Sequence, residues 1–533
     1  MTQGAEAPPL GRTEGLSVRS FLTAHGLSIG VAAASACAAG FLLHQLMAWP
    51  PHEDETLAMF VGRDSLGGVV EHVTRQRGGA PLHFLLAWAV AHLGFGLGGL
   101  RTVSAAFAVG SLPLVAVLGV LLAGRRAAFL ATVLVAGSWA FLFHGVYGRM
   151  YSMFLFFSLA SFVALLRALD RGGRLWVPWG AAILLCVATH PYGALVLASQ
   201  GLFVLLARRD RIHGATQAFG AVLVLGVPFW LTDVVLAGRF DVGVGGGGAK
   251  LDGPWAIATY LWRTAGDFSS GWWPVLGAVL LLVAGGLATV GRDSRLLCLS
   301  VVCVPLIAFL AARVGSSASP ESRHLVFVLP FFATLVAAGL TRATRRAPGL
   351  AVVVVSGLLV AEVAWAWHRT APLFQWEPDR RQAARSQAES YLAATSLPDD
   401  LLFGYESLYL GAWERNAAFP ATVLPRADHD LALRVLEQQP RPLGHGIWVL
   451  DASKRNNLRP RLEIKGSGPL PRAAFVSRVF GPFLVIRTTE PVATLDRYLL
   501  LAARAMRLGR ALGIGDADVN LQTIERARRV RRG

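Results

Sequence analysis

The sequence predicts a polytopic α-helical membrane protein with about 11 transmembrane helices, membrane-surface helices in the first outer loop, and a small C-terminal extracytoplasmic α/β domain. Its mean hydropathy is +0.50, and only 16% of its residues are charged. Apolar runs long enough to cross a bilayer recur between residues 22 and 367, whereas the composition after 367 is that of a soluble protein. We therefore expect a cytoplasmic tail (1–21), a transmembrane domain (22–367) and an extracytoplasmic domain (368–533).

The first apolar segment, 22–49, is predicted to be an uncleaved transmembrane helix. Arg12 and Arg19 precede this segment, as basic residues precede the apolar core of a signal peptide. However, the segment is longer than the apolar core of a signal peptide, which has roughly 7–15 residues, and further spans follow it.

Basic clusters in the short connections set the predicted topology, because Lys and Arg are enriched on the cytoplasmic side. If all clusters are cytoplasmic, each consecutive pair must enclose an outward and a returning helix. The clusters are Arg125-Arg126, Arg167–Arg174, Arg208–Arg211, Arg292–Arg295 and Arg342–Arg346. The predicted crossings after the first are 102–123, 127–145, 151–168, 175–189, 192–207, 215–236, 272–290, 296–313, 324–341 and 349–367.

The first outer loop, 50–101, contains an apolar stretch that does not fit this scheme as a crossing. The stretch 81–96 is short, it contains His83 and His92, and a full crossing there would move Arg125 to the outside. We expect it to be a re-entrant or surface-lying helix. The amphipathic stretch 64–74 before it predicts another helix lying on the membrane.

The C-terminal region has the pattern of a small α/β domain, because short β-type runs alternate with helical patterns. The β-type runs are Leu401–Tyr405, Gly446–Leu450 and Phe483–Ile486. The helical patterns are Asp379–Thr395, 428–438 and 491–508, and Val519–Arg532 is a basic helix or a frayed tail.

Charge and cysteine content exclude two classes of protein. The net charge is +17, but much of it lies in loops between spans, which argues against a nucleic-acid-binding protein. The four cysteines (Cys37, Cys186, Cys298 and Cys303) lie in apolar segments, so no disulfide framework is implied. Arg greatly outnumbers Lys among the basic residues, which is typical of GC-rich bacterial genomes and indicates a bacterial cell (inner) membrane.

Three consecutive acids, Glu53, Asp54 and Glu55, directly follow the first span and carry the main functional signal. Adjacent carboxylates at a low-dielectric boundary repel one another, so one of them can serve as a general base. A divalent metal on Asp54 and Glu55 is the competing use, because hard cations take carboxylate oxygens. No spaced partner motif accompanies the acids, so we expect no metal and no cofactor.

Further polar groups flank the predicted spans on the same outer side. Arg149 and Arg323 oppose the positive-inside bias, so they indicate a local anion such as a phosphate or carboxylate. The glycine-rich run 242–250 lacks the ending of a phosphate-binding loop, and we expect a flexible loop there. The candidate substrate-binding residues are Glu53, Arg149, Tyr151, His190, Tyr192, Arg323 and His324.

An ordered set of motifs resembles the large membrane glycosyltransferases of the C-type fold. The nearest groups are the protein O-mannosyltransferase-like family 39 and its aminoarabinose–lipid A transferase relatives. The resemblance covers roughly residues 22–395. The motifs are Trp49 with Asp54-Glu55-Thr56, Gly78-Gly-Ala-Pro-Leu-His-Phe-Leu85, Gly148-Arg-Met-Tyr-Ser-Met-Phe154, Thr189-His-Pro-Tyr192 and Ser322-Arg-His-Leu-Val-Phe-Val-Leu-Pro330.

The resemblance implies that Asp54 is the catalytic base and that Arg149 and Arg323 hold the phosphate of the donor. Two departures matter. Glu53 precedes the Asp-Glu pair, so the catalytic assignment can shift by one residue, and the second outer loop has no Asp beside Arg149. We expect Asp54 and Glu55 to be the catalytic residues.

The predicted activity follows from the same residues. The sequence has no nucleotide site, so the donor should be a hexose or pentose carried on a polyprenyl phosphate in the bilayer. Its phosphate leaves as an anion and needs a cationic clamp, whereas the acceptor hydroxyl needs one carboxylate base, and a single displacement inverts the anomeric centre. The acceptor is a glycan, glycolipid or protein of the cell envelope. The alternative is a transporter or flippase of a lipid-linked glycan, although the sequence has no internal repeat that would favour a transporter.

Overall fold

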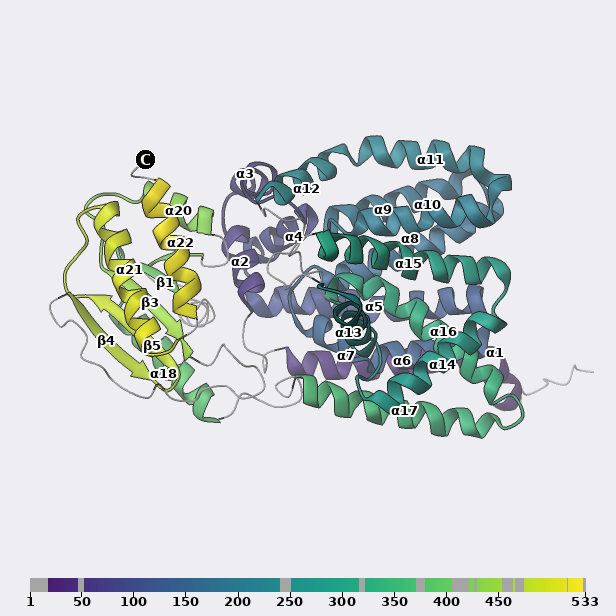
Figure 1. Cartoon of the computed structure of the whole chain (residues 1–533). Helices are drawn as coiled ribbons and strands as arrows, with labels where there is room; N and C mark the ends of the chain where they lie inside the picture. The colour runs from purple at the N-terminus through teal and green to yellow at the C-terminus, as the bar shows by residue number, and fades with distance from the viewer. Residues whose placement is uncertain are drawn as a thin grey trace, which may run out of the picture.

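The computed structural model describes a long helical bundle and a smaller α/β domain at one end of it (Figure 1). The residues that the structure describes are 18–46, 52–239, 251–315, 322–370, 379–404, 421–425, 429–452, 464, 474–514 and 516–530. The glycine-rich run 242–250 therefore lies outside the described residues, as do most of the N-terminal tail and Tyr405.

Each predicted crossing corresponds to a helix or to a bent pair of helices. They are α1 (Val18–Gln45), α5 (Leu97–Ala123), α6 (Arg125–Gly137), α7 (Trp139–Val146), α8 (Tyr151–Arg171), α9 (Trp176–Thr189), α10 (Gly193–Ala207), α11 (Ile212–Leu225), α12 (Val227–Arg239), α14 (Trp273–Thr289), α15 (Arg292–Gly315), α16 (Leu329–Ala343) and α17 (Pro348–Arg369). By length and composition, 6 helices within the described residues can cross a membrane, or up to 8 spans if each bent pair counts as one. Helices α9, α10 and α14 are apolar but shorter, so the count of about 11 crossings stays a prediction.

Two of the predicted crossings are bent. Helices α6 and α7 meet at 53°, and α11 and α12 meet at 56°. Ser138 lies at the first bend, where its side chain accepts a hydrogen bond from the backbone N–H of Phe141 and caps α7. As a result α7 is a separate short helix, and the residues that follow it belong to the candidate site.

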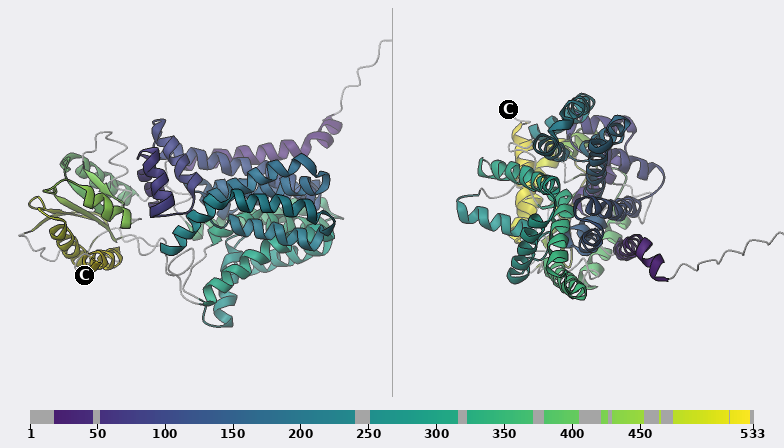
Figure 2. Two further views of the ribbon diagram at one scale, coloured as in Figure 1. Left: turned by 90° about the horizontal axis from the view of Figure 1, so that it is seen from above. Right: turned by 90° about the vertical axis from the view of Figure 1, so that its right-hand side faces the viewer.

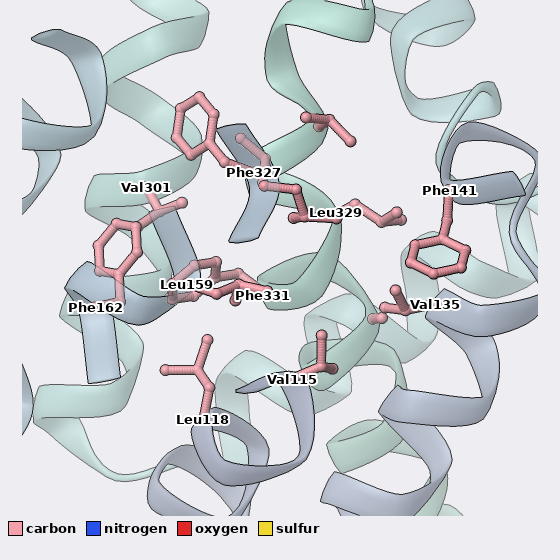
Figure 3. Close-up of a cluster of buried hydrophobic side chains, with 14 of the residues drawn as sticks. Val115, Leu118, Val135, Phe141, Leu159, Phe162, Val301, Phe327, Leu329 and Phe331 are labelled. Atoms are coloured by element: carbon pink, nitrogen blue, oxygen red, sulfur yellow. The ribbon is translucent and has the colours of Figure 1, made fainter. Parts of the chain in front are cut away.

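A continuous apolar core runs through the bundle, and Figure 3 shows part of it, with Phe162, Phe327 and Phe331 packed among aliphatic side chains. Helices α14 and α16 approach most closely at two glycines. A Cβ added at Gly339 would lie 2.0 Å from the carbonyl oxygen of Leu282, and one at Gly286 would lie 2.1 Å from that of Leu335. Only residues without a side chain allow these backbones to touch, as is usual at helix crossings in membranes.

The first loop folds into short helices at the end of the bundle that carries the α/β domain, which we call the domain end (Figures 1 and 2). They are α2 (Glu53–Gly62), α3 (Leu66–Glu71), the π-helix η1 (His72–Gln76) and α4 (Pro81–His92). The helices predicted over 64–74 and 81–96 are thus present, but a π-helix interrupts the first of them. The connection between the predicted crossings 215–236 and 272–290 also contains a helix, α13 (Pro254–Gly266), which the sequence analysis missed.

The α/β domain has a five-stranded mixed sheet with strand order β2-β1-β3-β5-β4. Strand β1 is parallel to β2 and β3, whereas β5 is antiparallel to β3 and β4. The predicted runs became β1, β3 and β5, and two strands, β2 and β4, were missed. The elements are α18 (Asp379–Thr395), β1 (Leu401–Gly404), β2 (Thr422–Leu424), α20 (His429–Gln438), β3 (Gly446–Asp451), β4 (Phe475–Phe480), β5 (Phe483–Thr488), α21 (Leu495–Ala511) and α22 (Asp516–Val530).

The α/β domain packs against the first loop. One cluster of buried apolar side chains contains Leu57 and Met59 of α2 together with Ala388 of α18 and Val449 of β3. Arg434 Nη2 of α20 also donates a hydrogen bond of 3.1 Å to Gln76 Oε1 of η1. The domain is therefore joined to the helices that carry the candidate site. The basic clusters of the α5–α6, α8–α9, α10–α11, α14–α15 and α16–α17 connections lie at the opposite end of the bundle (Figure 1).

Candidate active site

The N-terminus of α2 orients the acids of the first loop. His52 is its N-cap, and the imidazole Nδ1 accepts a hydrogen bond of 3.2 Å from the backbone N–H of Asp54. The Glu55 carboxylate accepts one of 2.8 Å from the backbone N–H of His52, which completes a capping box. Burial and the nearby Arg149 guanidinium lower the pKa of His52 to about 4, so the imidazole is a neutral acceptor at neutral pH.

Glu55 is fully buried, and both of its carboxylate oxygens are occupied. Oε1 accepts hydrogen bonds from Arg101 Nε (2.9 Å) and from the backbone N–H of Gly148 (2.5 Å). Oε2 accepts from Arg101 Nη2 (2.8 Å) and from the backbone N–H of His52. Burial raises the pKa of Glu55, but the Arg101 guanidinium and these hydrogen bonds outweigh that effect and leave the pKa below its ordinary value. This carboxylate ties α2, α5 and the turn after α7 together.

Asp54 is in a different position from Glu55. Its side chain is 34% exposed, whereas that of its partner, Arg149, is 3% exposed. Arg149 Nη2 forms an ion pair with Asp54 Oδ2. Burial raises the pKa of Asp54, but Arg149 together with the nearby His52, Arg77 and Arg323 outweighs burial, so the pKa lies below its ordinary value. Within the residues that the structure describes, Arg149 Nε is buried and has no hydrogen-bond partner.

The remaining predicted residues with described side chains gather around Tyr151, behind this ion pair. The Arg149 guanidinium lies 4.8 Å from the centre of the Tyr151 ring, and that of Arg323 lies 5.9 Å from it. The His190 ring is 5.6 Å from Tyr151 and 5.5 Å from that of His324. Tyr192 lies 4.8 Å from His324. Segments that are up to 175 residues apart (149 and 324) thus meet at one place.

Two buried polar residues were missed by the sequence analysis. Arg101, which is 1% exposed, is the partner of Glu55, and Glu362 of α17 accepts a hydrogen bond of 2.8 Å from the backbone N–H of Trp139. Both had a readable signal. Arg101 is a cation at the outer end of a predicted span, like Arg149 and Arg323, and Glu362 is an acid inside a predicted span.

The described acids of the first loop, Asp54 and Glu55, are already paired with arginines. Among the described residues, no group of three or more His, Cys, Asp or Glu side chains could hold a metal ion. Glu55 has its oxygens occupied and Asp54 is paired with Arg149, whereas the Glu53 side chain lies outside the described residues. The expectation that the reaction needs no metal therefore stays a prediction.

The fold, a multi-helix membrane domain with a first loop of short helices and an α/β domain, is similar to that of solved C-type membrane glycosyltransferases. Two solved structures share it. ArnT from Cupriavidus metallidurans bound to undecaprenyl phosphate matches with a TM-score of 0.60 and 14% identity, over 87% of this chain and 98% of that one. The oligosaccharyltransferase AglB from Archaeoglobus fulgidus, in complex with an inhibitory peptide and a dolichol-phosphate, matches with a TM-score of 0.52 and 9% identity, over 90% and 77%.

The sequence comparisons gave no match, neither with a protein-family model nor with a curated protein. The similarity in fold nevertheless confirms the resemblance that the sequence motifs predicted, at the level of architecture.

Proposed function

We propose that this protein is an integral-membrane glycosyltransferase that moves a sugar from a polyprenyl-phosphate-linked donor to an extracytoplasmic acceptor. The observation that carries the proposal is the pair of Asp54, a partly exposed carboxylate, and Arg149, a buried guanidinium whose Nε has no hydrogen-bond partner among the described residues. One group can accept a proton and the other can hold an anion, which are the two tasks of this transfer. The shared fold supports the proposal, because ArnT binds undecaprenyl phosphate and AglB binds dolichol-phosphate.

The proposed reaction is a single displacement. The acceptor oxygen forms a bond to the anomeric carbon as the bond from that carbon to the phosphate oxygen breaks, and the phosphate leaves with the electron pair. Arg149 and Arg323 stabilise the leaving phosphate, and Asp54 takes the proton of the acceptor hydroxyl. The nucleophile attacks opposite the leaving group, so the anomeric centre inverts.

The ion pair also suggests how donor binding prepares the base. While Arg149 is paired with Asp54, the low pKa of this carboxylate makes it a weak base. A donor phosphate competes for the same guanidinium. Once Arg149 turns to the phosphate, burial of Asp54 is less opposed, and the pKa rises towards a value useful for proton transfer.

Glu55 acts as a positioning residue in this proposal, although the sequence predicted a catalytic role for it. Both oxygens already accept hydrogen bonds, and the side chain is fully buried. It holds the backbone of Gly148 beside α2, and so holds Arg149 near Asp54. Glu55 therefore positions the two proposed reacting groups without touching the substrate.

The test is transfer of radiolabel from a panel of polyprenyl-phosphate sugars in membranes that contain the wild type or Asp54→Asn. We expect label to enter an acceptor only with the wild type. Asp170→Asn is the matched control, because Asp170 is 63% exposed and pairs with Arg208 in the α8–α9 region. Near-normal turnover by Asp54→Asn would refute the role of Asp54. No transfer by folded wild type from any donor would favour the transporter alternative.

A further inference from the structure

A polar pocket lies at the domain end of the bundle, away from Asp54, between α13 and the end of α17. Its main lining residues are Trp262, Arg263, Asp267, Trp365, His368 and Arg369. The proposed reaction uses none of these side chains. Gly271 also lines the pocket, and a Cβ there would lie 2.3 Å from the Trp365 ring, so this ring packs directly over the glycine backbone.

The charges of the pocket favour an anion. Arg369 Nε lies 3.4 Å from Asp267 Oδ1, so this arginine and the buried carboxylate largely neutralise one another. Arg263 is exposed, and its side chain has no hydrogen-bond or ion-pair partner within the described part of the chain. The pocket therefore keeps one uncompensated guanidinium, and it does so at the end opposite the basic clusters, where the positive-inside rule predicts few cations.

Aromatic rings form the other wall of the pocket. The Trp365 and His368 rings of the lining are 5.7 Å apart, and Trp272, which is not one of the lining residues, lies 5.3 Å from the His368 ring. Nε1 of Trp365 is buried and, among the described residues, has no hydrogen-bond partner. Trp rings at a membrane surface lie at the level of the lipid headgroups. A guanidinium beside such rings matches a headgroup that carries phosphate oxygens.

The pocket is connected to the candidate active site through α7. Trp139, the first residue of α7, donates from Nε1 to Thr370 Oγ1 at 3.1 Å, and the Arg369 guanidinium lies 5.4 Å from the centre of its ring. Arg149 follows the other end of this helix, about 12 Å along its axis. A headgroup in the pocket would thus lie beside the helix that leads to Arg149.

We propose that this pocket binds the anionic, phosphate-bearing headgroup of a lipid, with Arg263 contacting the phosphate and Trp365 contacting the remainder of the headgroup. The lipid is either an acidic phospholipid of the membrane or a phosphorylated glycolipid. The proposal concerns binding, so it stands independently of the glycosyl transfer proposed above.

The experiment measures lipid binding to the purified full-length protein by native mass spectrometry, with three probes. They are phosphatidylglycerol, phosphatidylcholine and a glycolipid with one phosphate monoester on its sugar. The variants are Arg263→Gln and Gly271→Ala. The control is Arg346→Gln, an exposed arginine of the basic cluster at the opposite end of α17. Arg263 is exposed, so its replacement should not disturb folding, which thermal melting of each variant checks.

We expect an acidic probe to bind at least about tenfold more tightly than phosphatidylcholine, and Arg263→Gln to reduce this affinity about tenfold while Arg346→Gln leaves it unchanged. Tighter binding of the phosphoglycolipid than of phosphatidylglycerol, lost in Gly271→Ala, identifies a glycolipid ligand. Equal binding of these two probes identifies an acidic phospholipid. Equal binding of phosphatidylcholine, or an Arg263→Gln variant that binds like the control, would overturn the proposal.

Discussion

Removing Arg101 should destabilise the protein more than the loss of an exposed ion pair would. The change Arg101→Met keeps a long apolar stem but leaves the Glu55 carboxylate buried, with the backbone N–H groups of His52 and Gly148 as its remaining donors among the described residues. Breaking a buried pair by removing one partner costs about 3–5 kcal/mol, because an uncompensated charge stays in a low-dielectric site. We therefore expect a loss of about 3–5 kcal/mol in the free energy of unfolding at neutral pH.

This loss can be measured by SDS-induced unfolding in mixed micelles, followed by tryptophan fluorescence. Glu525→Gln is the matched control, because the Arg507–Glu525 pair has a similar distance of 3.0 Å, but its side chains are 52% and 43% exposed. Exposed pairs contribute about 0–1 kcal/mol. The double variant Glu55→Gln/Arg101→Met should recover part of the loss, because it removes the stranded charge.

The pH dependence gives a second check on the same ion pair. A carboxylate with a lowered pKa stabilises the folded state above its ordinary pKa, 4.5 for Glu55, and this contribution disappears as the pH falls through the lowered value. The difference between wild type and Arg101→Met should therefore shrink below pH 4.5. The reasoning would be refuted if Arg101→Met cost no more than Glu525→Gln, or if the two single losses at residues 55 and 101 simply added.

Three further predictions concern the site and the bundle. For the free wild-type enzyme, the acid limb of kcat/KM due to Asp54 should lie below pH 3.8. Arg149→Gln should move this limb to higher pH, because it removes the strongest of the charges that oppose burial; an unmoved limb would exclude Asp54 as the titrating base. Gly148→Ala places a Cβ 2.9 Å from Leu100 Cγ, so it should shift the turn before Arg149 and lower kcat at least about tenfold in the transfer assay. The control Gly26→Ala, whose Cβ would lie in open space, should leave kcat unchanged. Gly339→Ala should cost about 1–3 kcal/mol in SDS unfolding, because α14 and α16 must separate; Gly277→Ala, with open space around it, is the control, and equal stability of the two variants would contradict the close crossing.

The sequence predicted most of the bundle, because apolar segments and basic clusters are local signals that need no partner. The bends at Ser138 and Gly226 were not predicted, since an apolar segment reads the same whether it is straight or broken. In the α/β domain, β4 was missed because it is a partly exposed edge strand, with Val476 at 52% exposure and Arg478 within it. Strand β2 has only 3 residues, too few to show a period.

The candidate site was predicted as a set of residues, but their separate roles were not. Asp54 and Glu55 are adjacent and chemically similar in the sequence, so composition cannot tell them apart. What separates them is the start of α2, which points Glu55 towards Arg101, 46 residues away, and leaves Asp54 beside Arg149. Such pairings depend on tertiary packing, which no local pattern encodes.

The contact between the α/β domain and the first loop limits how this protein can be recombined with its structural relatives. Ala388 and Val449 share one apolar cluster with Leu57 and Met59, and Arg434 donates to Gln76. A chimaera that exchanges residues 379–530 alone would place a foreign surface against α2, the helix that presents Asp54. Exchanging the domain together with residues 52–92 would carry both sides of that contact, so these two segments, distant in the chain, form one transplantable unit.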